Sequence, residues 1–339
     1  MSVYDVALAD REGFFSARVR ELCGFQNLSF FLVEPVWLRE FLEKLQRGQI
    51  GVGVLIDMAS DPYDRSDLYY RLAKEVKANG GHVIDDPDRS PLATHKSKFH
   101  QVLLQNHVPV PDTIFVERKD LPTFRVSDEI RARLGVPFVV KPGWGFGGRG
   151  VELNATSEAD VVRSAERRPE SDTFMLQKKL KPKTLEGRTA WFRIFHVCGE
   201  YITCWWQPGT GDYGMVSPLE RHRYGLLGLE KIVFKIAQLS KMEFFSTEIA
   251  MLEDGQFVAV DYLNDECDTH PKSYWPSGVP DEVVRRIAWL FVQKAVSVVH
   301  KHPFENELVE RDRDWQDSHK KRKLDNNAKA VEVAPGVVE

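Results

Sequence analysis

The sequence predicts a mixed α/β and α+β protein in which an N-terminal βαβ domain is followed by two further lobes. Three observations support this fold class. Residues 28–86 alternate short apolar runs with helical patterns, residues 93–180 contain a strand that leads into a glycine-rich loop, and residues 181–303 are rich in paired strands. The 339 residues are enough for more than one hydrophobic core, because single cores stop growing near ~250 to 300 residues.

The first part, residues 1–92, is predicted to be the βαβ domain. We expect strands at 29–33, 52–56 and 82–84, with helices at 36–45 and 68–78 between them. This rhythm is typical of a parallel sheet whose strands are joined by crossover helices. The patterns leave open whether residues 1–24 fold onto the same domain.

The second part, residues 93–180, is predicted to be a central lobe that carries the glycine-rich loop. We expect helices at 96–105 and 157–165 and strands at 113–116, 137–140 and 173–177. The first helix is predicted to end before Pro109 and Pro111, because a residue that precedes proline is disfavoured in the helical region.

The third part, residues 181–303, is predicted to be a β-rich C-terminal lobe. We expect strands at 191–197, 201–206, 244–252 and 256–263 and helices at 229–241 and 282–299. Beyond it, residues 304–339 are charged and contain few apolar residues, which is the composition of a disordered tail. A short basic cluster at 320–323 is interpreted as part of this solvated tail rather than as a nuclear signal.

The composition favours a soluble cytoplasmic protein that binds neither nucleic acid nor membranes. Charged residues nearly balance to a net charge of -4, so no strong overall field attracts polyanions. The four cysteines show no Cys-x-x-Cys spacing, which favours a reducing compartment. No apolar run reaches the ~20 residues that a membrane-spanning helix needs. We therefore expect a cytoplasmic location.

A lysine, Lys141, ends a predicted strand immediately before the glycine-rich loop at 143–150. Without Cβ atoms, such a loop can bring its backbone N–H groups close to phosphate oxygens. It is not a Walker A loop, because no Gly-Lys-Ser/Thr follows, and it is not a dinucleotide fingerprint, because residues 151–153 do not open a helix. We expect a hairpin lid over phosphate groups, with an ordinary flexible turn as the competing interpretation.

Two carboxylates, those of Glu248 and Asp261, are predicted to lie opposite each other. The last two strands flank Asp254-Gly255, a two-residue hairpin signal, and counting outward from this turn pairs Glu248 with Asp261. Opposed like charges destabilise a sheet by up to roughly 1 kcal/mol, and a divalent cation between them would turn repulsion into ligation. We expect Mg²⁺, which prefers oxygen ligands; a solvated acidic hairpin is the alternative.

Asn264 is the third candidate metal ligand. It lies three residues after Asp261, so in a regular strand it would point to the opposite face of the sheet. The polar run at 264–268 suggests that the strand ends there, which would allow the amide to turn back towards the carboxylates.

The order of these parts resembles the ATP-grasp superfamily. Residues 93–96, Ala-Thr-His-Lys, and 108–113, Val-Pro-Val-Pro-Asp-Thr, look like the family segment in which a lysine opens a helix and a Val-Pro-x-Pro-like run precedes a strand. Residues 138–151 look like the family's Val-Val-Lys-Pro strand and lid. The resemblance covers about residues 28–299 and implies a nucleotide held between two α+β lobes beneath the glycine-rich loop.

The resemblance also implies the residues that bind the nucleotide. These would be Lys96, Lys141, Gly145, Gly147, Gly148, Gln177, Lys178, Lys179 and Leu180. Lys98 is an alternative to Lys96 as the first phosphate-binding lysine. Lys178 and Lys179 stand where the family often has glutamate, so ribose recognition would differ here while backbone contacts to adenine would remain.

Arg193 is similar to the family's arginine that reaches the transferred phosphoryl group, and it is the candidate catalytic residue. Trp191 occupies the position two residues earlier where the family often has aspartate, and a buried structural arginine is the alternative. The resemblance assigns Glu248, Asp261 and Asn264 as metal ligands.

The resemblance implies an ATP- and Mg²⁺-dependent ligase of the carboxylate–amine type, with Mn²⁺ as a possible substitute for Mg²⁺. Its substrates would be a small carboxylate and an amine, or a peptide, and a homodimer is compatible with it. Arg221 and Arg223 are candidates for binding a carboxylate-bearing acceptor, because arginine favours bidentate anion contacts, and His270 is a third candidate. The alternatives are an ATP-grasp kinase, an acid–thiol ligase, and a non-catalytic ATP-binding regulatory protein.

Overall fold

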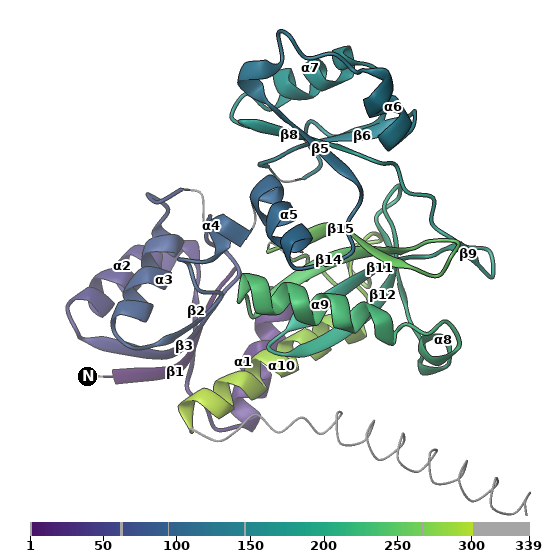
Figure 1. Ribbon diagram of the computed structural model, residues 1–339. Coiled ribbons are helices and arrows are strands. Elements are labelled where there is room, and N and C mark those ends of the chain that lie inside the picture. Colours follow the sequence, from purple (N-terminus) through teal and green to yellow (C-terminus); the bar gives the residue numbers. More distant parts are fainter. Residues whose placement is uncertain (1, 62–63, 94, 146, 266, 301–339) are drawn as a thin grey trace, which may run out of the picture.

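The protein is built from three units, each organised around its own sheet, in the computed structural model (Figure 1). The structure describes residues 2–61, 64–93, 95–145, 147–265 and 267–300. The predicted disordered tail, residues 304–339, lies outside the described residues. In the described part, no helix is both long and apolar enough to cross a membrane.

The first unit is a parallel sheet with strand order β2-β1-β3-β4. Its strands are β1 (Ser2–Ala9), β2 (Phe30–Val33), β3 (Ile50–Asp57) and β4 (His82–Ile84), and its helices are α1 (Phe14–Phe25), α2 (Pro35–Gln46) and α3 (Leu68–Ala78). The elements predicted between residues 29 and 84 are confirmed. The segment that the sequence left open supplies α1 and β1, a strand paired on both sides within the sheet.

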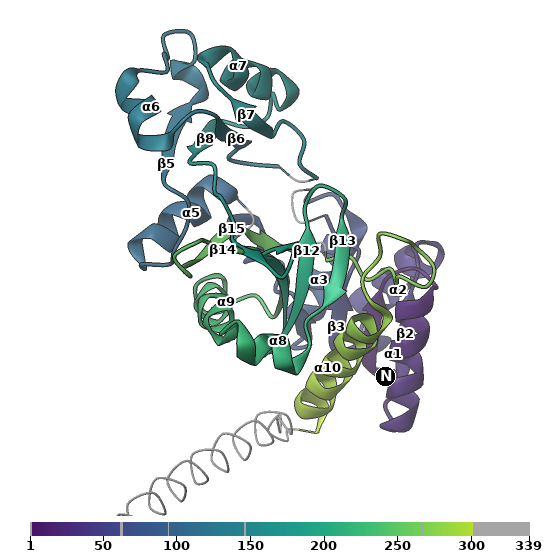
Figure 2. The same ribbon diagram turned by 90° about the vertical axis from the view of Figure 1, so that its right-hand side faces the viewer.

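Both faces of this sheet are buried, as is usual for parallel sheets. Along β1, Ala7 and Ala9 pack on the side of α2 and α3, whereas Val6 and Leu8 pack on the opposite side. That opposite side is covered by α1 and by α10 (Asp281–Val299), which returns from the far end of the described chain (Figure 2).

The second unit is an antiparallel sheet with strand order β5-β8-β6-β7. It contains β5 (Thr113–Glu117), β6 (Phe138–Pro142), β7 (Glu152–Ala155) and β8 (Thr173–Gln177), with α6 (Asp128–Leu134) and α7 (Glu158–Arg167) on one face. The short helix α4 (Ser90–Ala93) precedes α5 (Lys96–Gln105), which joins this unit to the first. β6 and β7 pair on either side of the glycine-rich loop, so the predicted hairpin is confirmed.

The third unit is a five-stranded antiparallel sheet with order β13-β12-β11-β14-β15. Its strands are β11 (Trp191–Val197), β12 (Glu200–Gln207), β13 (Asp212–Met215), β14 (Phe244–Met251) and β15 (Phe257–Asn264). The helices are α8 (Pro218–Arg223) and α9 (Leu227–Ser240), and a small hairpin is formed by β9 (Thr184–Leu185) and β10 (Arg188–Thr189). Phe99 and Leu103 of α5 belong to the same hydrophobic core as α9, so α5 packs onto this third unit.

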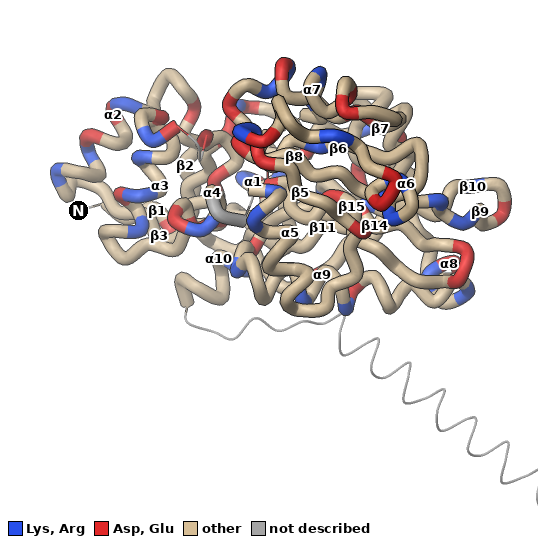
Figure 3. Tube along the Cα trace, turned by 45° about the horizontal axis from the view of Figure 1, so that its top comes forward, with Lys and Arg blue, Asp and Glu red and all other residues tan. Residues whose placement is uncertain are grey.

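Acidic and basic positions are interspersed along all three units rather than gathered into one continuous band of either sign (Figure 3). This distribution agrees with the nearly balanced net charge of -4. The predicted fold class, a mixed α/β and α+β protein with a βαβ unit followed by two lobes, is confirmed.

Candidate active site

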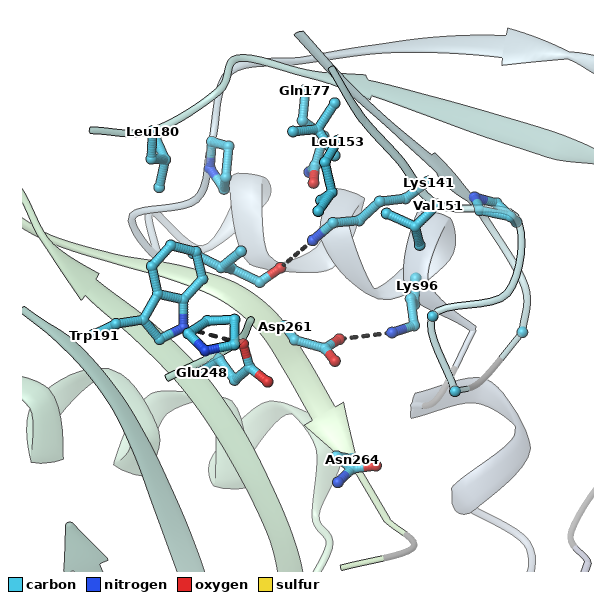
Figure 4. Close-up of a pocket in the computed structure, with 18 of the residues that line it drawn as sticks. Lys96, Lys141, Val151, Leu153, Gln177, Leu180, Trp191, Glu248, Asp261 and Asn264 are labelled. Carbon is cyan, nitrogen blue, oxygen red and sulfur yellow. Dashed lines mark hydrogen bonds and ion pairs between the residues drawn. The ribbon is translucent and has the colours of Figure 1, made fainter. Parts of the chain in front are cut away.

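A cleft of about 730 Å³ lies between the second and third units. Ligand sites in proteins commonly have volumes of about 300 to 1,000 Å³. All residues predicted to bind nucleotide, metal or the transferred phosphoryl group line this one cleft: Lys96, Lys141, Gly145, Gly147, Gly148, Gln177, Lys178, Lys179, Leu180, Arg193, Glu248, Asp261 and Asn264. Figure 4 shows the two lysines approaching from one side and the carboxylates from the sheet of the third unit.

A β-bulge brings Glu248 and Asp261 opposite each other. The predicted pairing of these two residues is confirmed, but the count from the turn is wrong, because Ala250 pairs with Val258 rather than with the next residue. Between this part of the ladder and the Glu248–Asp261 pair, Val260 is an extra residue on β15. The bulge therefore restores the opposition that a regular ladder in this register would have lost.

The bulge also supplies an acceptor to the cleft. The extra residue of a bulge is left outside the regular ladder, and the carbonyl oxygen of Val260 accepts a hydrogen bond of 2.9 Å from the Lys141 ammonium (Figure 4). Lys141 is thus held next to the strand that carries Asp261.

A second bulge turns Asn264 onto the face of the two carboxylates. Ser246 pairs with Asn264 and Glu248 pairs with Asp261, so two steps on β14 correspond to three on β15. Ser246 and Glu248 share a face because they are two residues apart. Asn264 is the last residue of β15, so the strand ends where the sequence predicted. The amide reaches the predicted face through the bulge and donates to the Ser246 hydroxyl at 3.3 Å.

Lys96 opens helix α5 and places its ammonium 2.7 Å from Asp261 Oδ1. Burial favours the neutral form of Asp261, but Lys96 and Lys141 outweigh it and hold the pKa of this carboxyl below its ordinary value. Burial lowers the pKa of Lys141, and the charge of Asp261 opposes that effect. The alternative lysine, Lys98, is exposed and does not line the cleft.

Glu248 is held from two directions by residues of β11. The Arg193 guanidinium forms an ion pair with Oε1, and the Trp191 indole N–H donates to Oε2 at 3.0 Å. Both charged side chains are only 13% exposed. Burial lowers the pKa of Arg193, but Glu248 and Tyr213 more than compensate and leave it raised.

Two aromatic residues contact Arg193, and neither contact was predicted from the sequence. The guanidinium carbon lies 4.2 Å from the centre of the Trp206 ring, and Arg193 donates to the Tyr213 hydroxyl at 3.1 Å. The indole of Trp191 also had no predicted role. Its only sequence signal is that it occupies the place of the family's aspartate beside Arg193.

The glycine-rich lid packs closely against Arg168, which is buried beneath it. Gly145 has φ of +137°, and a Cβ there would lie 2.5 Å from the guanidinium of Arg168. A Cβ at Gly150 would lie 2.6 Å from the same side chain. Gly147 and Gly148 have φ of +64° and +68°, in the left-handed region that glycine adopts without strain. Gly145 and Gly150 therefore leave room for Arg168, and Gly147 and Gly148 allow the left-handed backbone of the lid.

The segment 177–180 lines the cleft next to the lid. The buried amide of Gln177 donates to Thr113 Oγ1 at 3.0 Å and to the Tyr262 hydroxyl at 3.2 Å, so this side chain supports the segment from behind. Lys179 donates to Asn154 Oδ1 at 2.5 Å and thereby links the segment to β7 of the lid hairpin.

The three predicted acceptor-site residues do not line this cleft. Arg221 pairs with Glu230 at 2.7 Å, and Arg223 pairs with Glu186. His270 contacts Asp268 at 2.7 Å and lines a neighbouring hollow.

The donor set of the cleft suits a magnesium ion. Two carboxylates and an amide share one sheet face, and each carboxylate already contacts a cation, Lys96 or Arg193. No cluster of three or more His, Cys, Asp or Glu side chains arranged to hold a metal occurs in the described residues. The remaining ligands of a hard cation would therefore come from substrate phosphates and water, as is usual for Mg²⁺.

Comparison with known proteins gives many structural matches and one partial sequence match. No protein-family model matches the sequence. The chain is 30% identical over 134 residues to the carbamoyl phosphate synthase large chain of Xylella fastidiosa, which covers 38% of this chain. The chain spans about 11% of the length of that protein.

The structural matches extend over most of the molecule. An ATP-grasp RimK domain protein from Sphaerobacter thermophilus has a TM-score of 0.56 and 16% identity, covering 85% of this chain and 98% of its own. D-alanine–D-alanine ligase from Bacillus anthracis, solved with ATP, has a TM-score of 0.59 and 12% identity, covering 89% and 99%. The ATP-grasp ligase PsnB, solved with the precursor peptide PsnA2 and AMPPNP, has a TM-score of 0.56 and 12% identity, covering 88% and 98%. The chain therefore has the ATP-grasp fold, and the fold implied by the resemblance of its sequence is confirmed.

Proposed function

We propose that the protein is a ligase that uses ATP and Mg²⁺ to convert a carboxylate into an acyl phosphate, which an amine then attacks to form a C–N bond. One observation carries this proposal. Lys96 and Lys141 meet Glu248, Asp261 and Asn264 in a single cleft beneath a glycine-rich lid.

The proposed chemistry explains why the cleft contains cations rather than general bases. A carboxylate does not react with an amine at neutral pH, because its carbonyl is resonance-stabilised and oxide is a poor leaving group. Phosphorylation makes phosphate the leaving group. The site then has to position the reactants and neutralise the phosphoryl group during transfer, which is what lysine, arginine and magnesium do.

Each side chain has a distinct role in the proposed reaction. Lys96 and Lys141 bind phosphate oxygens, and the backbone of residues 177–180 binds adenine. Glu248, Asp261 and Asn264 hold Mg²⁺, which when bound neutralises phosphate charge. Without ligands, Lys96 and Arg193 compensate Asp261 and Glu248. Both cations become available to the phosphates and the acyl phosphate oxygens once the two carboxylates hold a metal.

The lid protects the intermediate in this proposal. Gly145, Gly147 and Gly148 expose backbone N–H groups where phosphate oxygens would lie, because no Cβ atom covers them. Closure of the lid over the nucleotide excludes water and limits hydrolysis of the acyl phosphate.

The acceptor of the proposed ligase is an amine, carried either by a small molecule or by a peptide. Both kinds of substrate occur among proteins that share the fold. D-alanine–D-alanine ligase is named for a small amino acid. PsnB was solved in complex with a precursor peptide. A kinase that phosphorylates a hydroxyl and an acid–thiol ligase keep the same cleft and remain the alternatives. A non-catalytic ATP-binding protein is less well supported, because it does not require the paired metal carboxylates.

Trapping with hydroxylamine tests the proposal. Purified protein is incubated with ATP, Mg²⁺, hydroxylamine and pools of small carboxylates, and hydroxamate and ADP are measured. A ligase gives both products in equal amounts, because hydroxylamine attacks an acyl phosphate. ADP formation with a stable phosphate ester and no hydroxamate would establish the kinase instead.

Two matched variants locate the activity. Asp261→Asn removes a carboxylate from the cleft, and Asp254→Asn removes one from the exposed turn of the same hairpin. We expect loss of hydroxamate in the first and unchanged formation in the second. Equal activity of the two variants would show that the β14–β15 carboxylates are not the metal site.

A further inference from the structure

A second hollow, of about 630 Å³, adjoins the cleft. Asp265 lines both cavities, so the second hollow opens next to the metal-ligand candidates on β15. One wall contains residues at the carboxyl ends of strands of the first unit: Asp57 is the last residue of β3, and Asp10 and Asp85 directly follow β1 and β4. The opposite wall belongs to the third unit and includes Phe244 and His270.

The position of this hollow is one at which open α/β sheets bind ligands. The strand order β2-β1-β3-β4 reverses direction between β1 and β3, and Asp10 and Asp57 lie at the carboxyl ends of these two strands. Ligands of such sheets bind in the crevice outside the carboxyl ends, at the point where the order reverses. The strand order therefore indicates a ligand site here without any reference to the charged residues of the wall.

Two carboxylates of this wall, those of Asp57 and Asp85, are fixed by backbone groups. Asp57 accepts from the N–H groups of Ala59 and Ser60 at 3.2 and 3.0 Å, and Asp85 accepts from Phe244 N at 3.0 Å. Neither forms an ion pair with lysine or arginine in the described part of the chain. Burial raises the pKa of Asp57 to about 6 and that of Asp85 well above its ordinary value. A bound cation would relieve this cost of burial.

A third hollow, of about 840 Å³, continues from the second. The two share five lining residues: Asp10, Met58, Ala59, Thr269 and His270. The outer wall is aromatic, with the Phe14 and Tyr274 rings 6.0 Å apart. Tyr274 is 70% and Trp275 57% exposed, so flat apolar surface faces this hollow without being covered by the rest of the described chain.

We propose that these two connected hollows bind the acceptor of the ligase, and that this acceptor is an elongated primary amine. Its ammonium group lies between Asp57 and Asp85 beside the cleft, and its apolar or aromatic remainder lies against Tyr274 and Trp275. The assignment of an acceptor rests on the proposed ligase function, whereas the binding of a cationic amine does not.

The proposed placement is consistent with the chemistry of amide formation. The ammonium loses a proton to a neighbouring carboxylate, the nitrogen lone pair forms the new C–N bond, and the C–O bond to phosphate breaks. Phosphate leaves with the bonding electron pair and takes up the second proton of the nitrogen, which leaves a neutral amide, and the carboxylate returns the first proton to solvent. A carboxylate next to the amine thus both binds the cationic form and accepts its proton.

Calorimetric titration of the full chain, with Mg²⁺ and a non-hydrolysable ATP analogue present, tests the binding claim. The probes are 4-phenylbutylamine, its neutral isostere 4-phenylbutan-1-ol, and the anion 4-phenylbutanoate. We expect saturable binding of the amine and affinities at least about tenfold lower for the alcohol and the anion. Equal or tighter binding of the alcohol or the anion would overturn the proposal.

Three variants assign the binding to the two hollows. We expect Asp57→Asn, which retains an oxygen for the Ala59 and Ser60 N–H groups, to weaken amine binding about tenfold or more. Asp128→Asn removes an equal charge from an exposed position of the second unit and should leave amine binding unchanged. Trp275→Ala should weaken 4-phenylbutylamine more than butylamine, because only the former reaches the aromatic wall. An unchanged affinity in Asp57→Asn, with nucleotide binding intact, would contradict the proposal.

The outcomes separate this inference from the proposed function. Amine binding that depends on Asp57, combined with no hydroxamate formation, would keep the amine site and refute the ligase. Hydroxamate formation together with amine binding that is indifferent to Asp57 would keep the ligase and refute the amine site.

Discussion

At the scale of single residues, Trp191 is the clearest departure of the cleft from the pattern of the ATP-grasp proteins that the sequence resembles. Its indole N–H donates to Glu248 Oε2 while Arg193 occupies Oε1, so the carboxylate is oriented before a metal arrives. Groups that orient a metal ligand in this way commonly change metal affinity by about 10- to 100-fold when they are removed. In the proposed ligase, Trp191 is therefore a positioning residue rather than a catalytic one.

We predict that Trp191→Phe weakens Mg²⁺ binding about tenfold and leaves Mg²⁺-free nucleotide binding unchanged. The measurement is the affinity for an ATP analogue as a function of Mg²⁺ concentration. Trp37→Phe, at a half-exposed position of α2, is the matched control and should have no effect. An identical Mg²⁺ dependence in both variants would mean that the indole has no role in orienting Glu248.

The buried histidines make a second prediction at this scale. Burial lowers the pKa of both His100 and His196 to about 4, whereas an unfolded histidine titrates near ~6.5. Between these values the unfolded chain binds more protons than the folded one, so stability is full above about pH 6.5 and decreases as the pH falls towards 4. Each histidine contributes a slope of up to about 1.4 kcal/mol per pH unit.

The variant His196→Gln tests the direction of this pH dependence of stability. We expect the variant to be less stable at neutral pH, because the ring packs against Phe245 at a centroid distance of 5.0 Å. Its free energy of unfolding, measured in urea at several pH values, should nevertheless depend less on pH between 4 and 6.5 than that of the original protein. A parallel dependence would show that His196 is not the group that titrates.

At the scale of elements, periodic patterns predicted the regular helices and strands but not the irregular ones. Helix α3 was predicted correctly because its buried residues recur at helical spacing over three turns. Strand β1 was not predicted, since Asp5 interrupts its apolar run; in the structure this carboxylate accepts from Ser29 N at 2.8 Å. The bond explains how a charged residue is accommodated in a strand within the sheet.

In the candidate site, too, regular features could be predicted from the sequence and irregular ones could not. The opposition of Glu248 and Asp261 was predicted by counting from a two-residue turn, but the structure reaches this pairing through a different register and a bulge. The two bulges that produce this opposition and that turn Asn264 onto the same face could not be predicted, because no local residue preference marks them. The stacking of Trp206 on Arg193 was not predicted, because this contact depends on tertiary structure.

The lid provides a prediction that belongs to this scale. Gly145→Ala should reduce affinity for the ATP analogue strongly, because its Cβ would meet the Arg168 guanidinium at 2.5 Å and displace the loop. Gly147→Ala should have a smaller effect, since a Cβ there meets no atom within 4 Å and costs only the left-handed strain of about 1–2 kcal/mol. Calorimetry of both variants is the measurement; the reverse order of affinities would contradict this account of the lid.

At the scale of the whole molecule, α10 connects the first and third units. Phe291 is fully buried and contacts Phe15 of the first unit and Phe244 of the third, with ring centroids 6.1 and 4.9 Å away. The predicted domain limits at residues 92 and 180 remain predictions. Hydrophobic cores contain residues from both sides of each limit.

We predict that Phe291→Ala lowers the free energy of unfolding by about 3–5 kcal/mol, the usual cost of truncating a buried phenylalanine. Phe234→Ala, at a half-exposed position of α9, should change it by less than about 0.5 kcal/mol. Urea unfolding followed by tryptophan fluorescence should give one transition for the first and third units together. Two separate transitions in the original protein would show that α10 does not couple them.

The late position of α10 also has a consequence for biosynthesis. The strands β1 and β3 leave the ribosome early together with α1, but α10, the second helix that covers this face of their sheet, begins only at Asp281. At a synthesis rate of about 5–20 residues per second, this face remains without α10 for roughly 10 to 45 seconds. During translation the nascent chain therefore displays an apolar surface that ribosome-associated chaperones can recognise, and slower elongation prolongs that exposure.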